Sequence, residues 1–138
     1  MKTTSVIKIR GYHIDHFGHV NHARYIEFLE EGRWDYMEKN QLIDLFHNTG
    51  IIHTVAGIAV DYKSSARAGN IIRMESALGK VGQKSFSMDQ KMYLKESLIL
   101  KAIVTNAFID LSSQKPVMPN KNLINGWQDL ADSIEKEV

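Results

Sequence analysis

The sequence contains no cysteine, only two prolines and no long apolar run. Without cysteine, the chain cannot form disulfides, supply thiolate metal ligands or use a cysteine nucleophile. No stretch approaches the roughly 20 apolar residues that a membrane-spanning helix requires. Positive and negative residues are also nearly balanced, because the formal net charge is only +1. This balance favours neither a nucleic acid nor an anionic membrane as a partner.

The composition that is present is typical of a soluble globular protein. Hydrophobic residues make up 43% of the 138 positions and charged residues 24%. A chain of this length can bury a core of its own, so we expect a single domain over 1–138. The N-terminus becomes charged before any apolar run could act as a signal peptide, and we therefore expect a cytoplasmic protein.

Hydrophobic spacing predicts one long helix after a short first strand. The strand covers 4–10, and from His22 to Met37 apolar residues recur at helical spacing. Gly32 lies on the apolar side of this helix, which indicates that the helix passes close to another backbone there. A second, short helix is expected over 41–47.

Four further strands are expected after residue 50, joined by short turns. They cover 51–62, 71–78, 85–94 and 98–111, and residues 127–138 predict a C-terminal helix. The last strand has apolar residues on both sides, which is typical of burial on two faces. The predicted fold class is α+β, an antiparallel sheet wrapped around one long helix. A second subunit is the simplest cover for the other face of the sheet.

The segment 12–25 concentrates chemistry-bearing side chains just before the long helix. It holds one carboxylate, Asp15, with four histidines and Asn21, whose side chain is a good helix N-cap. A helix N-terminus offers unpaired N–H groups to a developing oxyanion, and a nearby carboxylate can attack a carbonyl or activate water. The alternative role for Asp15 is to brace its own loop through an Asx turn.

The four histidines of this segment are spaced by three, at positions 13, 16, 19 and 22. On one helix face, this spacing would resemble a row of metal ligands. However, Gly18 and Asn21 indicate a loop as far as Asn21, and zinc sites usually combine mixed spacings. We therefore expect no metal site, and we expect most of these histidines to bond local backbone groups.

Asp15 is the best nucleophile that the chain offers, because there is neither a cysteine nor a Gly-x-Ser-x-Gly motif. His22, at the first helical position, would place its backbone N–H at the helix end and its imidazole near Asp15. Tyr25, one turn later, is a further site candidate, with a core residue as the alternative interpretation.

These residues carry a resemblance to a known family. The pattern Asp15-x-x-Gly18-His19-Val20-Asn21-x-x-x-Tyr25, followed by Glu27-Phe28-Leu29-Glu30-Glu31, resembles the hotdog-fold acyl-CoA thioesterases of the 4-hydroxybenzoyl-CoA thioesterase superfamily. Residues 10–34 resemble in particular the bacterial FadM-type long-chain acyl-CoA thioesterases.

The resemblance implies a five-stranded antiparallel sheet around the long helix, and homodimers or dimers of dimers with active sites at the subunit interface. It implies that Asp15 is the nucleophile or general base and that the backbone amide of His22 polarises the thioester carbonyl. The His22 side chain is a second possible contributor. Asn21 and Tyr25 belong to the same catalytic motif.

Coenzyme A carries phosphates, so cationic side chains are expected near the mouth of the site. Lys63 and Arg67 are the candidates, and a solvated charged turn is the alternative. The chain departs from the family pattern at Ser65, where a proline is common, and at Asn70, where an acidic residue is common.

We therefore predict an acyl-CoA thioesterase that releases coenzyme A and a free fatty acid of medium to long chain length. Coenzyme A is part of the substrate, and no cofactor is expected. Three alternatives stay open: a hotdog-fold 3-hydroxyacyl hydratase or dehydratase, a non-catalytic acyl or acyl-carrier binding protein, and a metal-dependent protein. The hydratase would need a second proton-transfer motif, which we do not find in the sequence.

Overall fold

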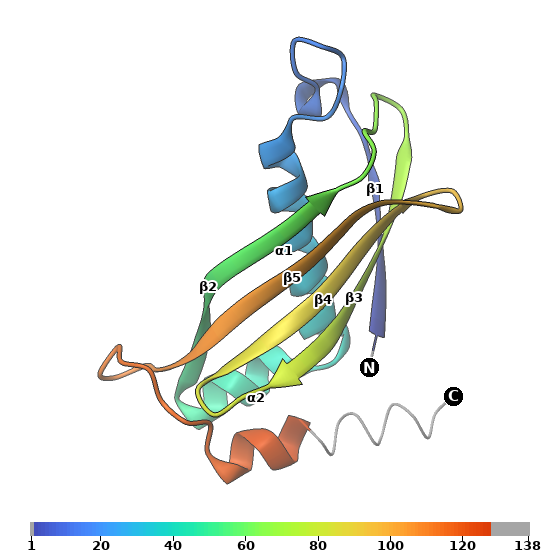
Figure 1. Cartoon of the computed structure of the whole chain (residues 1–138). Coiled ribbons are helices and arrows are strands. Elements are labelled where there is room, and N and C mark those ends of the chain that lie inside the picture. Colours follow the sequence, from blue (N-terminus) through green and yellow to red (C-terminus); the bar gives the residue numbers. More distant parts are fainter. Residues whose placement is uncertain (1, 128–138) are drawn as a thin grey trace.

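The computed structural model describes residues 2–127, in which a five-stranded antiparallel sheet curves around one long helix (Figure 1). The elements are β1 (Lys2–Lys8), the short 3-10 helix η1 (Gly11–His13), α1 (His22–Lys39), α2 (Leu42–Thr49), β2 (Ile51–Tyr62), β3 (Ile71–Val81), β4 (Ser85–Leu94) and β5 (Ser97–Asp110). The predicted α+β class is confirmed. Residues 121–127 are helical, and the rest of the predicted C-terminal helix over 127–138 lies outside the described residues. No helix within 2–127 has the length and apolar character to cross a membrane.

The strand order is β1-β3-β4-β5-β2, so β2 and β3 are not neighbours. The expectation that a short turn joins these two strands is wrong, because the loop 63–70 carries the chain from one side of the sheet to the other. This loop is bonded to the segment before α1: the Val20 N–H donates to the Ala66 carbonyl at 3.0 Å, and the Ile9 N–H donates to the Asn70 carbonyl at 2.9 Å. The loops before α1 and after β2 therefore meet at one end of the molecule (Figure 1).

Strand β5 is an interior strand, and from Leu100 to Phe108 one of its faces is buried whereas the other is exposed or half-buried. Leu100, Ala102 and Val104 are buried, whereas Lys101 is exposed and Ile103 keeps 46% of its surface exposed. The prediction of burial on both faces is wrong, because the helices cover only the concave face of the sheet. In a single copy of the chain, Ile103 on the other face is exposed to solvent, and Ala107 and Ile109 are half-buried.

Helix α1 begins where the sequence predicts, because Asn21 caps it: the Ala23 N–H donates to Asn21 Oδ1 at 2.9 Å. The helix buries Tyr25, Phe28, Leu29, Gly32, Tyr36 and Met37 against the sheet. The predicted alternation of β4 is confirmed, since Phe86, Met88, Gln90 and Met92 are all buried. Each large apolar side chain in such a core contributes about 1.5–3 kcal/mol to folding.

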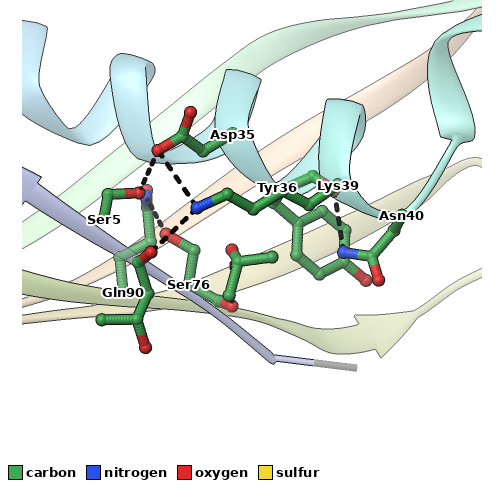
Figure 2. A network of polar contacts seen from close by, with 9 residues as sticks. Ser5, Asp35, Tyr36, Lys39, Asn40, Ser76 and Gln90 are labelled. Carbon is green, nitrogen blue, oxygen red and sulfur yellow. Dashed lines mark hydrogen bonds and ion pairs between the residues drawn. The ribbon is translucent and has the colours of Figure 1, made fainter. Parts of the chain in front are cut away.

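A seam of polar contacts fixes α1 over the sheet (Figure 2). Gln90 of β4 donates through Nε2 to the Leu29 carbonyl and to Ser76 Oγ, both at 2.9 Å. Towards the other end of the helix, Ser5 of β1 donates through Oγ to Asp35 Oδ2 at 2.5 Å. These bonds satisfy buried polar groups and set the rotation and height of α1 on the sheet.

Gly32 lies where α1 comes closest to the sheet. A Cβ atom at this position would lie 2.7 Å from Met74 Cε and 2.9 Å from Gln90 Nε2. The predicted close approach is confirmed, but the nearest atoms belong to side chains of β3 and β4 rather than to a backbone.

We expect Gly32→Ala to lower the free energy of unfolding by about 1–3 kcal/mol, as overpacking does in other cores. The gain of about 1 kcal/mol in helix propensity offsets part of the clash, but Gln90 is held by its hydrogen bonds and cannot move freely. Urea denaturation measures the change. Gly11→Ala is the control, because no atom lies within 4 Å of a Cβ there. A Gly32→Ala protein as stable as the wild type would contradict the expected clash.

Candidate active site

The segment 13–21 forms a narrow hairpin-like loop that ends at the start of α1. The Asp15 N–H donates to the His19 carbonyl at 2.8 Å, and the Asn21 N–H donates to the His13 carbonyl at 2.9 Å. Gly18 adopts a φ of 80°, which lets the chain turn between the two arms. The loop therefore holds Asp15 across from His19, a few residues before the helix end.

The carboxylate of Asp15 is half-buried and is fixed through one oxygen. Oδ1 accepts hydrogen bonds from the Phe17 N–H at 2.9 Å and from the His19 N–H at 3.3 Å, so the Asx turn considered for this residue is present. Within residues 2–127, no group donates to Oδ2. Asp15 can therefore brace the loop through Oδ1 and act on a ligand through Oδ2.

The first turn of α1 leaves one backbone donor without a protein acceptor. The Ala23 and Arg24 amides donate to the side chain and the carbonyl of Asn21, both at 2.9 Å. For the His22 amide, no acceptor is found in the described part of the chain, and the His22 side chain is exposed. The Tyr62 hydroxyl donates to the His22 carbonyl at 3.0 Å, which fixes the helix start to the end of β2.

Tyr25 is part of the core and also joins the two loops. Its hydroxyl accepts a hydrogen bond from the Ala66 N–H at 2.9 Å, and its ring packs edge-on against Tyr62. Burial raises the pKa of the Tyr25 hydroxyl, and the nearby Asp15 carboxylate adds a smaller effect in the same direction. Tyr25 therefore stays protonated and holds the loop 63–70 beside the loop of Asp15.

The histidines of the loop do not gather. His13 is buried against Phe28, and its Nδ1 accepts a hydrogen bond from the Arg10 N–H at 2.9 Å, as expected for a histidine that bonds local backbone. Burial is the main reason that the pKa of His13 is lowered, with the positive charge of Arg24 acting in the same direction. His16 and His22 are exposed. Among residues 2–127, no three metal-binding side chains lie close enough to hold an ion.

Lys63 and Arg67 lie exposed on the loop that packs beside the Asp15 loop. Lys63 Nζ is 3.1 Å from Asp61 Oδ2, an ion pair on the surface. The backbone of Arg67 is fixed instead, because its N–H donates to Asn70 Oδ1 at 2.7 Å. Asn70, at the position where the family pattern has an acidic residue, thus shapes this loop.

A cavity of about 760 Å³ lies between α1, α2, β2 and β5, a place that the sequence does not predict. Its apolar lining comes from Trp34, Met37, Ile43, Phe46, Ile52 and Val55, and its polar lining includes Glu30, Arg33, His53 and Asn106. A signal was present in the sequence: Asn106 is the one polar residue in the inward-facing series 102, 104, 106 and 108 of β5.

The family model of the thioesterase-like superfamily matches residues 9–127. The chain belongs to this superfamily. Its curated relatives include the long-chain acyl-CoA thioesterase FadM of Escherichia coli, 36% identical over 111 residues, which cover 79% of this chain and 84% of FadM. The acyl-CoA thioesterase YbgC of Haemophilus influenzae is 28% identical over 102 residues, which cover 72% of this chain and 75% of YbgC.

Solved structures give the same result for the fold. The probable thioesterase YbaW of Escherichia coli superposes with a TM-score of 0.85 at 32% identity, covering 92% of this chain and 97% of that one. The 1,4-dihydroxy-2-naphthoyl-CoA thioesterase Slr0204 of Synechocystis superposes with a TM-score of 0.80 at 15% identity, covering 95% of this chain and 98% of that one, a likeness of fold alone. The hotdog fold implied by the motif is thereby confirmed. As a member of this superfamily, the chain belongs to the class of thioester hydrolases.

Proposed function

We propose that this protein hydrolyses medium- to long-chain acyl-CoA thioesters, with Asp15 as nucleophile or general base and the His22 amide as oxyanion donor. One observation carries the proposal: a carboxylate with a free oxygen stands just before a helix whose first amide lacks an acceptor in residues 2–127. The names of FadM and YbgC, both acyl-CoA thioesterases, support the substrate class. That of FadM supports the chain length.

The chemistry follows from these two groups. As a general base, Asp15 would take a proton from water while the water oxygen attacks the thioester carbonyl. The carbonyl oxygen gains negative charge, which the His22 N–H stabilises by a hydrogen bond at the positive end of the helix dipole. Collapse of the intermediate breaks the C–S bond, and the thiolate of coenzyme A takes up the proton. In the nucleophilic route, Asp15 Oδ2 attacks first, and water then cleaves the mixed anhydride. Neither route needs a cofactor.

A second copy of the chain is the proposed partner along β2. This strand is at the edge of the sheet, and the side chains over 54–59 are all exposed. Val55, Ile58 and Tyr62 expose 42%, 37% and 45% of their surface. A 12-residue apolar edge with unpaired backbone groups favours pairing with another strand, and a twofold axis makes that pairing antiparallel.

Such a dimer would join the two halves of the site. Antiparallel pairing about the middle of 54–59 sets the His53 end of one β2 beside the Tyr62 end of the other. Because Tyr62 is bonded to the start of its own α1, the cavity of one copy would lie near the catalytic loop of its partner. A cavity of about 760 Å³ is within the range that takes small-molecule ligands, so it is our candidate for the acyl chain.

The test is release of free thiol from a panel of saturated acyl-CoA substrates of increasing length, repeated with the same acyl groups on acyl-carrier protein. We expect thiol release that rises with chain length. Enoyl absorbance changes without thiol release would indicate a hydratase instead. Acyl-CoA that is bound and left intact would indicate a binding protein, and loss of activity with a chelator would indicate a metal-dependent enzyme.

A further inference from the structure

The cavity between α1, α2, β2 and β5 has a mixed apolar and polar mouth and carries polar groups in its less exposed part. Trp34, Ile43 and Val55 line it and are unusually exposed for large apolar residues. Deeper in, His53, Asn106 and Arg33 contribute polar groups. A plain alkyl chain that filled this cavity would remove water from these groups and give them no hydrogen bond in return, which is unfavourable.

His53 and Asn106 form a fixed pair. Asn106 donates through Nδ2 to the Val104 carbonyl at 3.4 Å, which turns its Oδ1 towards His53, whose Nδ1 lies 3.3 Å away. Asn106 Oδ1 is an acceptor only, so Nδ1 of His53 carries the proton and Nε2 is left as an acceptor in the neutral ring. Burial lowers the pKa of His53; the hydrogen bond with Asn106 opposes this effect and the positive charge of Arg33 reinforces it, and the net shift favours the neutral ring.

Arg33 supplies the matching donors. Its Nη1 donates to Gln90 Oε1 at 3.1 Å, and it makes no ion pair within the described residues. A guanidinium group carries five N–H donors, so several are available to a ligand. Glu30, one turn earlier on α1, lines the same cavity, and its negative charge opposes the entry of a second carboxylate beside Arg33.

We propose that this cavity selects fatty acyl chains that carry a hydroxyl group, with Arg33 donating to the hydroxyl oxygen and His53 Nε2 accepting the hydroxyl proton. A hydroxyl is a small substituent that can accept a hydrogen bond from Arg33 and donate one to His53 Nε2 at the same time. The inference rests on the proposed function, because the acyl group is delivered as a thioester. It assigns Arg33, His53 and Asn106 to specificity rather than to catalysis.

The test compares dodecanoyl-CoA with the same chain hydroxylated near its middle or at its end. Two positions are needed because Arg33 lies about 16 Å along α1 from His22 in the same copy, whereas a partner's catalytic loop would be nearer. We expect kcat/KM for thiol release to be about 10- to 100-fold higher for one of the hydroxylated chains, the range expected when buried polar groups gain or lose a partner.

The double variant His53→Phe/Asn106→Leu should weaken this preference several-fold, since only Arg33 then remains to bond the hydroxyl, and should raise kcat/KM for the plain chain. Phe fits the site, because the ring of His53 already packs edge-on against Phe46 and Phe86. Replacing both polar partners together leaves neither unpaired. His47→Phe makes the same change at an exposed position of the cavity lining, and the hydroxyl preference should survive it.

Several outcomes would overturn the inference. These are equal kcat/KM for plain and hydroxylated chains, a preference that is undiminished in the double variant, or a stronger preference for a chain ending in a carboxylate. Calorimetric binding of the free acids separates the inference from the proposed function. If no thioester were cleaved, the proposed function would fail, but tighter binding of hydroxydodecanoate than of dodecanoate, weakened in the double variant, would still support the cavity's selectivity.

Discussion

Replacing Asp15 by asparagine is expected to lower kcat for acyl-CoA hydrolysis by about 100- to 10,000-fold, the usual contribution of a positioned acid or base. The substitution removes the negative charge of Asp15 while the hydrogen bonds that hold its loop are kept. Asn offers the same Oδ1 acceptor to the Phe17 and His19 amides, so the Asx turn is kept. What is lost is the second carboxylate oxygen, which could otherwise take a proton or attack the carbonyl.

Steady-state thiol release measures the effect on kcat, and thermal unfolding followed by circular dichroism checks the fold. Asp15→Ala should be both inactive and less stable, because it removes the loop bonds as well. Asp89→Asn, an exposed carboxylate on β4, should change neither quantity. The assignment of Asp15 would be refuted by an Asp15→Asn enzyme with the wild-type melting temperature and more than a tenth of the wild-type kcat.

The parts of the site that could be predicted from sequence are those set by local contacts. Asn21 caps α1 with an amide only two residues away, and Asp15 bonds amides two and four residues away. Such bonds depend on residue type and spacing, which the sequence displays. The same is true of β4, whose alternating apolar residues all face the core.

The parts that could not be predicted depend on contacts between distant segments. Nothing local places β2 beside β5 rather than β3, because that choice is made by the loop 63–70 as it crosses over the start of α1. The cavity has the same origin. His53 and Asn106 are 53 residues apart and meet only because β2 pairs with β5. Separately, each looks like an isolated polar residue in a strand.

The exposed edge of β2 leads to the second large effect. We expect Ile58→Lys to convert the proposed dimer into monomers and to lower kcat/KM for acyl-CoA by more than about 100-fold, because the proposed partner completes the acyl site. Ile58 is partly exposed in the single chain, so a lysine there leaves the monomer's core intact. In the paired strands, residue 58 lies within two residues of the twofold axis, so the interface would have to bury one lysine from each copy. Burying like charges without partners strongly opposes association.

Sedimentation and thiol release on the same samples separate the possible results. Val6→Lys is the matched control, because Val6 is 68% exposed on β1, the opposite edge of the sheet. That strand has only 7 residues against 12 in β2, and we expect its variant to remain an active dimer. A monomeric Ile58→Lys protein with wild-type kcat/KM would place the whole site within one copy. A monomeric Val6→Lys protein would move the interface to β1, and the cavity would then lie far from any partner's catalytic loop.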